Sequence, residues 1–262
     1  MTSSNLKQRI STVVNHLLHP FNLKVSSLSQ IEKLHAKLEK LQKKELAHQV
    51  NYNNFWSWLR QEYDINAVID IGANNGDFAA FLANFFSPKV IYAFEPLKSC
   101  LPALEATQQS IQNLKVFNLA LSDNSGQATF YENSYAPSSS LLHVSDYSKD
   151  EFPQTKGETQ ITVEVAKLDD ILDGESVPKD ILIKIDCQGT EDLVIAGGKK
   201  IFSLAKCVLI EVSFVPMYEK QPLFEDIHQI LAGLGYRFAG IKNQISSVKN
   251  GQPLFAHCLY VR

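Results

Sequence analysis

The order of apolar and polar positions divides the chain into two regions. Between Leu28 and Leu46 apolar residues recur every three to five positions, and Lys and Glu fill much of the space between them. This spacing places the apolar side chains on one face of a helix, and a second amphipathic piece follows around residues 52–62. We therefore expect an N-terminal helical extension over residues 1–64. We favour packing of this extension on the rest of the protein. A homodimer formed through the helices is the alternative interpretation.

In the second region, residues 65–262, short apolar runs alternate with stretches of helical periodicity. Repeated strand-then-helix units predict an α/β domain with a largely parallel sheet covered on both faces. The expected strands are 67–71, 89–94, 114–119, 181–185, 206–212, 236–241 and 255–261, and the expected helices are 77–86, 97–110, 190–201 and 223–234. The stretch 242–253 is too short for a crossover helix, so the last two strands should form an antiparallel pair at the sheet edge.

Composition narrows the class of protein. Apolar residues make up 45% and charged residues 20% of the 262 residues, and the formal net charge is −3. These values are typical of a soluble globular protein, and the slightly acidic balance disfavours nucleic acid as a partner. The sequence shows no apolar run that could span a bilayer, no signal-peptide pattern and no CxxC pair. We therefore expect a cytoplasmic protein with reduced thiols and no metal site.

Ligands of an open α/β sheet bind beyond the carboxyl ends of its strands, so the first strand end is informative. There Asp70 precedes a turn that runs from Gly72 to Gly76 and leads into a helix. The GxxxG spacing differs from the GxGxxG of nicotinamide enzymes and from the GxxxxGK[ST] of phosphate-binding loops. The charge of Asp70 would repel a pyrophosphate and would suit a ligand with an ammonium group.

The next two strand ends extend this picture. Glu95-Pro96 follows the second strand, where a carboxylate can accept hydrogen bonds from both hydroxyls of a ribose. An alternative and compatible interpretation is a surface Glu before Pro96 in the first turn of a helix. The third strand ends near Asn118–Leu121, whose amide and apolar groups could line an adenine. The three ends together predict a pocket for an adenosine with an amino-acid tail, which describes S-adenosylmethionine.

Motifs from Asp70 to the C-terminus resemble those of one protein family. In order they are DIGANNGDF, AFEP, NLALSDNSGQATFY, SSSLL, VAKLDDIL, LIKIDCQGTEDLVIAGG, LIEVS, LGY and LYVR. As a set they resemble the FkbM-type methyltransferases over residues 65–262. The resemblance implies a class I methyltransferase (Rossmann-like) fold with a seven-stranded sheet and a reversed last hairpin. It also implies S-adenosylmethionine as cofactor, and a hydroxyl of a sugar, glycan or secondary metabolite as methyl acceptor.

The resemblance also implies roles for single residues. Around the methionine part of the donor it places Asp70, Gly72, Ala73 and Asn74. It places Glu95, next to Pro96, at the ribose, and Asn118, Ala120 and Leu121 along the adenine. Asp186 should face the cleft near the methyl group that is transferred.

A hydroxyl acceptor must lose a proton, and a placed base assists this step. Asp186 is the first candidate base, Glu211 the second and His143 the third. Contact of Asp186 with the donor's ammonium group is an equal alternative, and His143 suits a surface position as well. The polar stretch 134–158 is expected to cover the acceptor site.

Two other classes of function remain open. A nicotinamide oxidoreductase is disfavoured by Asp70 and by the missing GxGxxG. A catalytically silent nucleoside-binding module that recruits partners through its N-terminal helices is the second alternative. The acceptor itself, whether a small molecule or a glycan, is not determined by the sequence.

Overall fold

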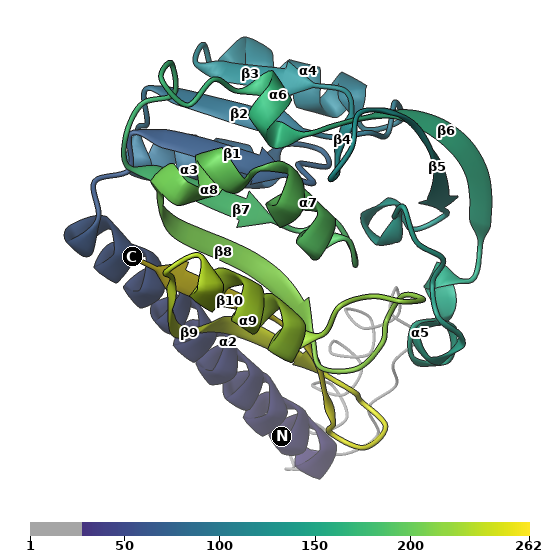
Figure 1. Ribbon diagram of the computed structural model, residues 1–262. Coiled ribbons are helices and arrows are strands. Elements are labelled where there is room, and N and C mark those ends of the chain that lie inside the picture. Colours follow the sequence, from purple (N-terminus) through teal and green to yellow (C-terminus); the bar gives the residue numbers. More distant parts are fainter. Residues whose placement is uncertain (1–27) are drawn as a thin grey trace, which may run out of the picture. The chain divides into compact units, whose positions relative to one another are not determined.

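The computed structural model describes residues 28–262, without the side chains of residues 28–32, 34–35 and 44–53. Two compact units divide the chain, one ending at Trp58 and the other beginning at Leu59. One continuous helix, α2 (Leu28–Glu62), replaces the two amphipathic pieces expected from the sequence (Figure 1). The first part of the expected extension, residues 1–27, lies outside the described residues. The domain boundary at residue 64 and the homodimer stay predictions.

A seven-stranded sheet forms the centre of the second unit, in the order β3-β2-β1-β7-β8-β10-β9. Its strands are β1 (Ala67–Ile71), β2 (Val90–Phe94), β3 (Leu114–Phe117), β7 (Ile181–Ile185), β8 (Ala205–Ser213), β9 (Arg237–Ser246) and β10 (Pro253–Val261). The first five strands of this order pair in parallel, and β10 is antiparallel to both of its neighbours. The predicted α/β fold with an antiparallel last hairpin is therefore confirmed.

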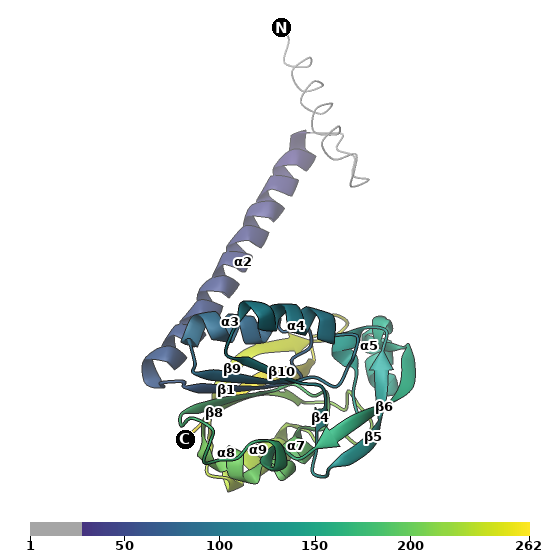
Figure 2. The ribbon, with the colours of Figure 1, turned by 90° about the horizontal axis from the view of Figure 1, so that it is seen from above.

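The central strands are buried along their whole length because helices cover both faces of the sheet, and apart from Asp70 in β1 and Lys184 in β7 they are apolar. Every residue of β1, β2 and β7 is buried. Helices α3 (Asp77–Phe86) and α4 (Leu101–Ser110) lie on one face, and α7 (Glu191–Gly197), α8 (Lys199–Leu204) and α9 (Phe224–Gly233) lie on the other (Figure 2). This arrangement agrees with the expected parallel sheet buried on both sides.

The expected single helix over 190–201 is two short helices in the structure. Gly197 ends α7, and a Cβ added to it would lie 2.0 Å from the carbonyl oxygen of Ser122. Gly198 then has non-helical dihedral angles and precedes α8. A new helix start needs acceptors for its first N–H groups, and Asp169 accepts hydrogen bonds from the N–H groups of Lys200 and Ile201. Asp169 lies in the short helix α6 (Leu168–Ile171).

A second, three-stranded sheet has the order β4-β6-β5. It contains β4 (Ala120–Leu121), β5 (Gly126–Asn133) and β6 (Glu158–Ala166), and it lies beyond the carboxyl ends of β1 and β2 (Figure 1). Between β5 and β6 the chain forms the short helices η2 (Ala136–Ser138), α5 (Asp146–Glu151) and η3 (Pro153–Thr155). The stretch 134–158 is thus a folded segment at the sheet end where ligands of α/β proteins bind.

Among the residues that the structure describes, no helix combines the length and the apolar character needed to cross a membrane.

Candidate active site

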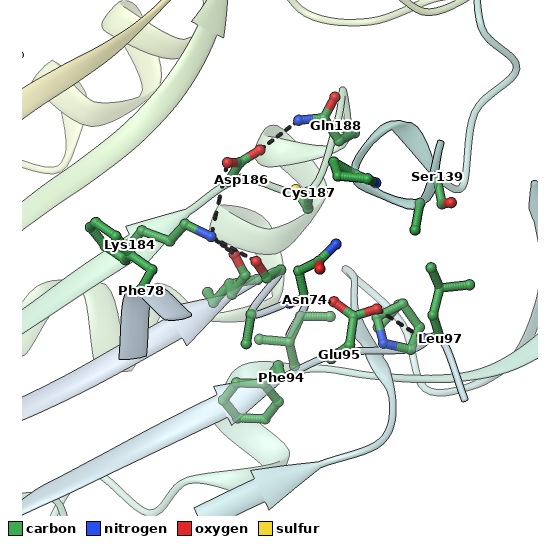
Figure 3. Close-up of a pocket in the computed structure, with 18 of the residues that line it drawn as sticks. Asn74, Phe78, Phe94, Glu95, Leu97, Ser139, Lys184, Asp186, Cys187 and Gln188 are labelled. Atoms are coloured by element: carbon green, nitrogen blue, oxygen red, sulfur yellow. Dashed lines mark hydrogen bonds and ion pairs between the residues drawn. The ribbon is translucent and has the colours of Figure 1, made fainter. Parts of the chain in front are cut away.

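A cavity of about 420 Å³ opens at the carboxyl ends of β1, β2 and β7 (Figure 3). The main sheet supplies one wall through the turn after β1, through Glu95 after β2 and through Lys184 and Asp186 of the β7 end. Phe130 of β5 and the segment that contains Ser139 supply the opposite wall. The segment between β5 and β6 therefore borders the cavity, and its expected role as a cover of the acceptor site stays a prediction.

The turn after β1 has a backbone that only glycine accommodates at its first position. Gly72 has a φ of +74°, and a Cβ there would lie 1.9 Å from the carbonyl oxygen of Asp186. The N–H groups of Gly72 and Ala73 both donate to the carbonyl oxygen of Phe94 at 3.0 Å. Asn74 follows with a φ of +48°. Gly72, Ala73 and Asn74 all line the cavity, so the structure brings together these three predicted residues.

Glu95 connects the ends of β1 and β2. Its Oε2 accepts a hydrogen bond from the Asn74 N–H at 2.8 Å, and its Oε1 accepts one from the Leu97 N–H at 2.9 Å (Figure 3). Burial raises the pKa of Glu95, and these two hydrogen bonds oppose the shift. Each carboxylate oxygen has a second acceptor position. The side chain is thus held in one orientation at the cavity wall and can still accept hydroxyl groups of a ligand.

The chain after β3 contributes apolar residues to the cavity wall and an asparagine that supports the backbone after β2. Ala120 and Leu121 line the cavity together with Pro96. Asn118 is not among the lining residues. Its side-chain amide donates to the carbonyl oxygens of Glu95 and Pro96 at 2.9 and 3.0 Å. Asn118 therefore supports the chain that carries Glu95, whereas the sequence placed it along an adenine.

Asp70 does not reach the cavity, which differs from its predicted contact with a ligand's ammonium group. Its side chain is 0% exposed, and its Oδ1 lies 3.2 Å from Nζ of Lys184. Lys184 stands opposite Asp70 in the register of β1 and β7. The same Nζ donates to the carbonyl oxygen of Gly72 at 2.7 Å. Asp70 is thus the buried counter-ion of a lysine that fastens the turn.

Lys184 is a site residue that the sequence analysis did not single out. Burial lowers the pKa of Lys184, but the carboxylates of Asp70 and Asp186 raise it by more, so the net shift is upward. The ammonium group therefore stays charged. The available signal was a single Lys inside the apolar run ILIKI. A buried cation needs an anion beside it, and only the strand order identifies which one.

Three titratable side chains meet where Asp186, just after β7, approaches Glu211 of β8 and His257 of β10. Nε2 of His257 lies 3.5 Å from Oδ2 of Asp186 and 3.8 Å from Oε2 of Glu211. The amide nitrogen of Gln188 donates to Asp186 at 2.5 Å and to Glu211 at 3.0 Å. Tyr218 in turn donates to the Gln188 amide oxygen at 2.6 Å. The structure therefore brings together the first two predicted bases and adds His257. Asp186 and His257 line the cavity, whereas Glu211 is not among its lining residues.

The two carboxyl groups of this cluster differ in their expected protonation. Burial alone would raise the pKa of Asp186, but Lys184 and His257 beside it hold that pKa below its usual range. Burial and the neighbouring Asp186 raise the pKa of Glu211 well above its usual range. The surroundings therefore favour the carboxylate form of Asp186 and the neutral, protonated form of Glu211.

The ligand atoms of Asp186, Glu211 and His257 lie within 4.8 Å of one another, which is compact enough for a shared cation. Oxygen and imidazole donors suit several divalent metals. The ammonium group of Lys184 already neutralises part of this charge, and the amide of Gln188 donates a hydrogen bond to Asp186 and another to Glu211. That no metal is used stays a prediction.

His143, the third candidate base, does not lie at the cavity. Its Nδ1 is 3.4 Å from Oε2 of Glu158, and its ring packs on Tyr131. Its side chain is 47% exposed. The surface interpretation of His143 therefore agrees with the structure, and we do not assign it a role in proton transfer.

Glu191 is a buried carboxyl group that should make stability depend on pH. It is 3% exposed, and its Oε1 accepts the Gly189 N–H at 3.0 Å. Burial, only partly offset by backbone hydrogen bonds, raises its pKa from 4.5 to about 7. Between these values the folded protein binds more protons than the unfolded chain, so the free energy of unfolding should fall as the pH rises through this window.

The substitution Glu191→Gln keeps the acceptor oxygen and removes the charge. At about pH 8 the variant should be more stable than the wild type by up to about 3 kcal/mol, and near pH 4 the two should be equal. Urea unfolding at both pH values measures the difference, with Glu105→Gln on the exposed side of α4 as control. A stability difference that does not change with pH would contradict the prediction.

Residues 70–238 match the family model of the methyltransferase FkbM domain. The 2-O-methyltransferase NoeI of Sinorhizobium fredii (strain NBRC 101917 / NGR234) is 27% identical over 161 residues, which cover 59% of this chain and 66% of NoeI.

Methyltransferases are among the solved structures that this chain matches, with low identity. Methyltransferase FkbM from Methylobacillus flagellatus KT has a TM-score of 0.49 and 16% identity, and the match covers 76% of this chain and 44% of that one. Precorrin-6y C5,15-methyltransferase from Geobacter metallireducens GS-15 has a TM-score of 0.40 and 12% identity, with 76% of this chain and 81% of that one covered. The family model alone spans most of the α/β unit described above. The chain belongs to the FkbM methyltransferase family.

Proposed function

We propose that this protein transfers a methyl group from S-adenosylmethionine to a hydroxyl oxygen of a sugar, a glycan or a secondary metabolite. The observation that carries the proposal is the position of Glu95 on the cavity wall, held by the N–H groups of Asn74 and Leu97. A fixed carboxylate at the end of the second strand suits the two hydroxyls of a ribose. Ala120, Leu121 and Phe130 beside it offer an apolar wall for the adenine.

Oxygen is the proposed acceptor atom for two reasons. The relative NoeI is described as a 2-O-methyltransferase. The cavity also holds a group that can accept the proton of a hydroxyl, because Asp186 is ionised and lies beside His257. Such a proton acceptor accelerates a reaction by about 10²–10⁴-fold.

Positioning supplies the rest of the catalysis in this proposal. The methyl group of a sulfonium donor is already activated, so the acceptor oxygen needs to be held in line with it. The Gly72–Asn74 turn would hold the donor, and the segment with Ala136, Pro137 and Ser139 would hold the acceptor from the opposite wall. All four cysteines are free, which supports the cytoplasm as the proposed compartment.

Calorimetric titration tests this function. The wild-type protein should bind S-adenosylmethionine and S-adenosylhomocysteine and should not bind NAD. Glu95→Gln should weaken the binding of S-adenosylhomocysteine by roughly 10- to 100-fold, because a charged hydrogen-bond acceptor is lost. Glu105→Gln, an exposed change on α4, should leave it unaltered. Binding of NAD, or no binding of S-adenosylhomocysteine, would reject the proposal. If S-adenosylhomocysteine binds, mass spectrometry after incubation with hydroxylated acceptors identifies the methylated product.

A further inference from the structure

Lys242 is brought to the cavity by an irregularity in strand β9. Ile241 pairs with Cys258 of β10, and the next pair is Asn243 with His257, so Lys242 is an extra residue on β9. Such a β-bulge changes the direction of a side chain. Adjacent residues of a regular strand point to opposite faces of the sheet, yet Lys242 and Asn243 both line the cavity. The bulge accounts for this, whereas the sequence analysis placed Lys242 in a loop.

The surroundings of Lys242 connect it with the turn after β1. Its Nζ lies 5.7 Å from the centre of the Phe78 ring, in the first turn of α3. Nζ of Lys184 lies 5.8 Å from the centre of the same ring. Burial lowers the pKa of Lys242 to about 8, an effect opposed by Asp186 and reinforced by Lys184. Lys242 is therefore a partly desolvated ammonium group at the Phe78 side of the cavity.

The other lysine at this end of the cavity is already engaged. Nζ of Lys184 contacts Asp70 and donates to the carbonyl oxygens of Ile71 and Gly72. These contacts direct its charge toward the interior of the sheet. Among the described residues that line the cavity, Lys184 and Lys242 are the two lysines. Lys242 is the second cation at the cavity, and its Nζ lies on the Phe78 side, where it can meet an anionic group of a ligand.

The proposed donor has an anionic group at the matching end. Its nucleoside would lie at Glu95, so its amino-acid part would extend past the Gly72–Asn74 turn toward Phe78 and Lys242. That part carries an α-carboxylate and an α-ammonium group. We propose that Lys242 binds the α-carboxylate of the donor's methionine moiety, a contact that the β-bulge in β9 makes possible. This inference rests on the proposed function.

The proposed contact between Lys242 and the carboxylate is tested by comparing two ligands, with and without the amino-acid part, on the wild type and on a variant without the lysine. S-adenosylhomocysteine has the amino-acid part, whereas 5′-methylthioadenosine keeps only the adenosine and the thioether. Lys242→Met keeps an unbranched apolar side chain and removes the charge. It should weaken the binding of S-adenosylhomocysteine by about 10- to 100-fold and change that of 5′-methylthioadenosine by less than about twofold. Lys242→Arg should recover most of the affinity.

A matched control is available on β3. Lys115 is exposed, and its Nζ lies 5.4 Å from the centre of the Tyr92 ring, outside the cavity. Lys115→Met therefore removes a lysine over an aromatic ring without touching the site, and both affinities should stay at the wild-type value. Thermal unfolding of each variant identifies any loss of folded protein.

The possible failures are distinct. Unchanged binding of S-adenosylhomocysteine by Lys242→Met would overturn the inference while the proposed function stands. A higher KM for acidic acceptors with unchanged donor affinity would overturn it too and would assign Lys242 to the acceptor. An equal loss of affinity for both ligands would point to general damage of the site and would also overturn it. A wild-type protein that binds neither ligand would overturn the proposed function itself.

Discussion

Replacing Lys184 with methionine is expected to lower the free energy of unfolding by about 3–5 kcal/mol, because the substitution leaves an uncompensated buried charge. Asp70 is 0% exposed, and Nζ of Lys184 is 3.2 Å from its carboxylate. Methionine fills a similar volume without a charge. Loss of Nζ also removes the hydrogen bond to the carbonyl oxygen of Gly72. The variant should therefore bind the donor more weakly as well.

The double variant Asp70→Asn, Lys184→Met separates the ion pair from packing. With both charges removed, most of the lost stability should return, because isosteric neutral groups carry a smaller desolvation penalty. Urea unfolding of the wild type, both single variants and the double variant provides the cycle. Lys206→Met is the control, since Lys206 and Asp180 form an exposed pair at 4.0 Å and should contribute less than about 1 kcal/mol. A double variant as unstable as Lys184→Met would show that packing dominates.

Asp186→Asn is expected to lower turnover by about 10²–10⁴-fold, the range of a lost general base. The reason is that Lys184 and His257 keep Asp186 ionised, whereas asparagine cannot accept a proton. Initial rates at saturating donor and acceptor measure the effect. Titration with S-adenosylhomocysteine separates the two roles that the sequence left open. Loss of donor affinity together with unchanged turnover would assign Asp186 to the ammonium group instead.

Glu211→Gln is the matched control for this prediction. Burial and Asp186 raise the pKa of Glu211 and favour its neutral carboxyl group, which resembles glutamine in shape and charge. Its Oε1 accepts the Gln188 amide, and the amide oxygen of glutamine can accept the same hydrogen bond. Turnover should therefore fall by less than about tenfold, one pKa unit of interaction energy. A loss equal to that of Asp186→Asn would place the proton-accepting role on Glu211.

The architecture was largely predictable because it depends on local periodicity. Buried apolar runs such as Ile181–Ile185 identify strands, and the short connection before Pro253 identifies the antiparallel hairpin. The errors concern local interruptions. The glycine pair Gly197-Gly198 divides one expected helix into two, because Gly197 packs directly on the Ser122 backbone. Such a close approach depends on a distant segment, so the sequence carries no local sign of it.

For the site, strand ends predicted which segments meet but not how each side chain is used. Glu95 and Gly72 lie at the cavity as expected, since a turn and a strand tip set their positions. Asp70 and Asn118 belong to the same segments, yet both support neighbouring groups and do not face the cavity. One residue along a strand changes the face of the sheet, and the available partners then decide the contact.

The sequence by itself determined the strands, the glycine turn after β1 and the carboxylate after β2, because these follow from periodicity and from backbone conformations at neighbouring residues. Only the tertiary structure decided which charges face each other. Asp70 stands opposite Lys184, and Glu211 stands opposite His257, because of the order and register of strands that are far apart in the chain. The bulge that turns Lys242 into the cavity likewise arises from the pairing of β9 with β10. Which distant strands become neighbours depends on packing across the whole sheet, so the residues of one strand do not by themselves identify the charge that it will face.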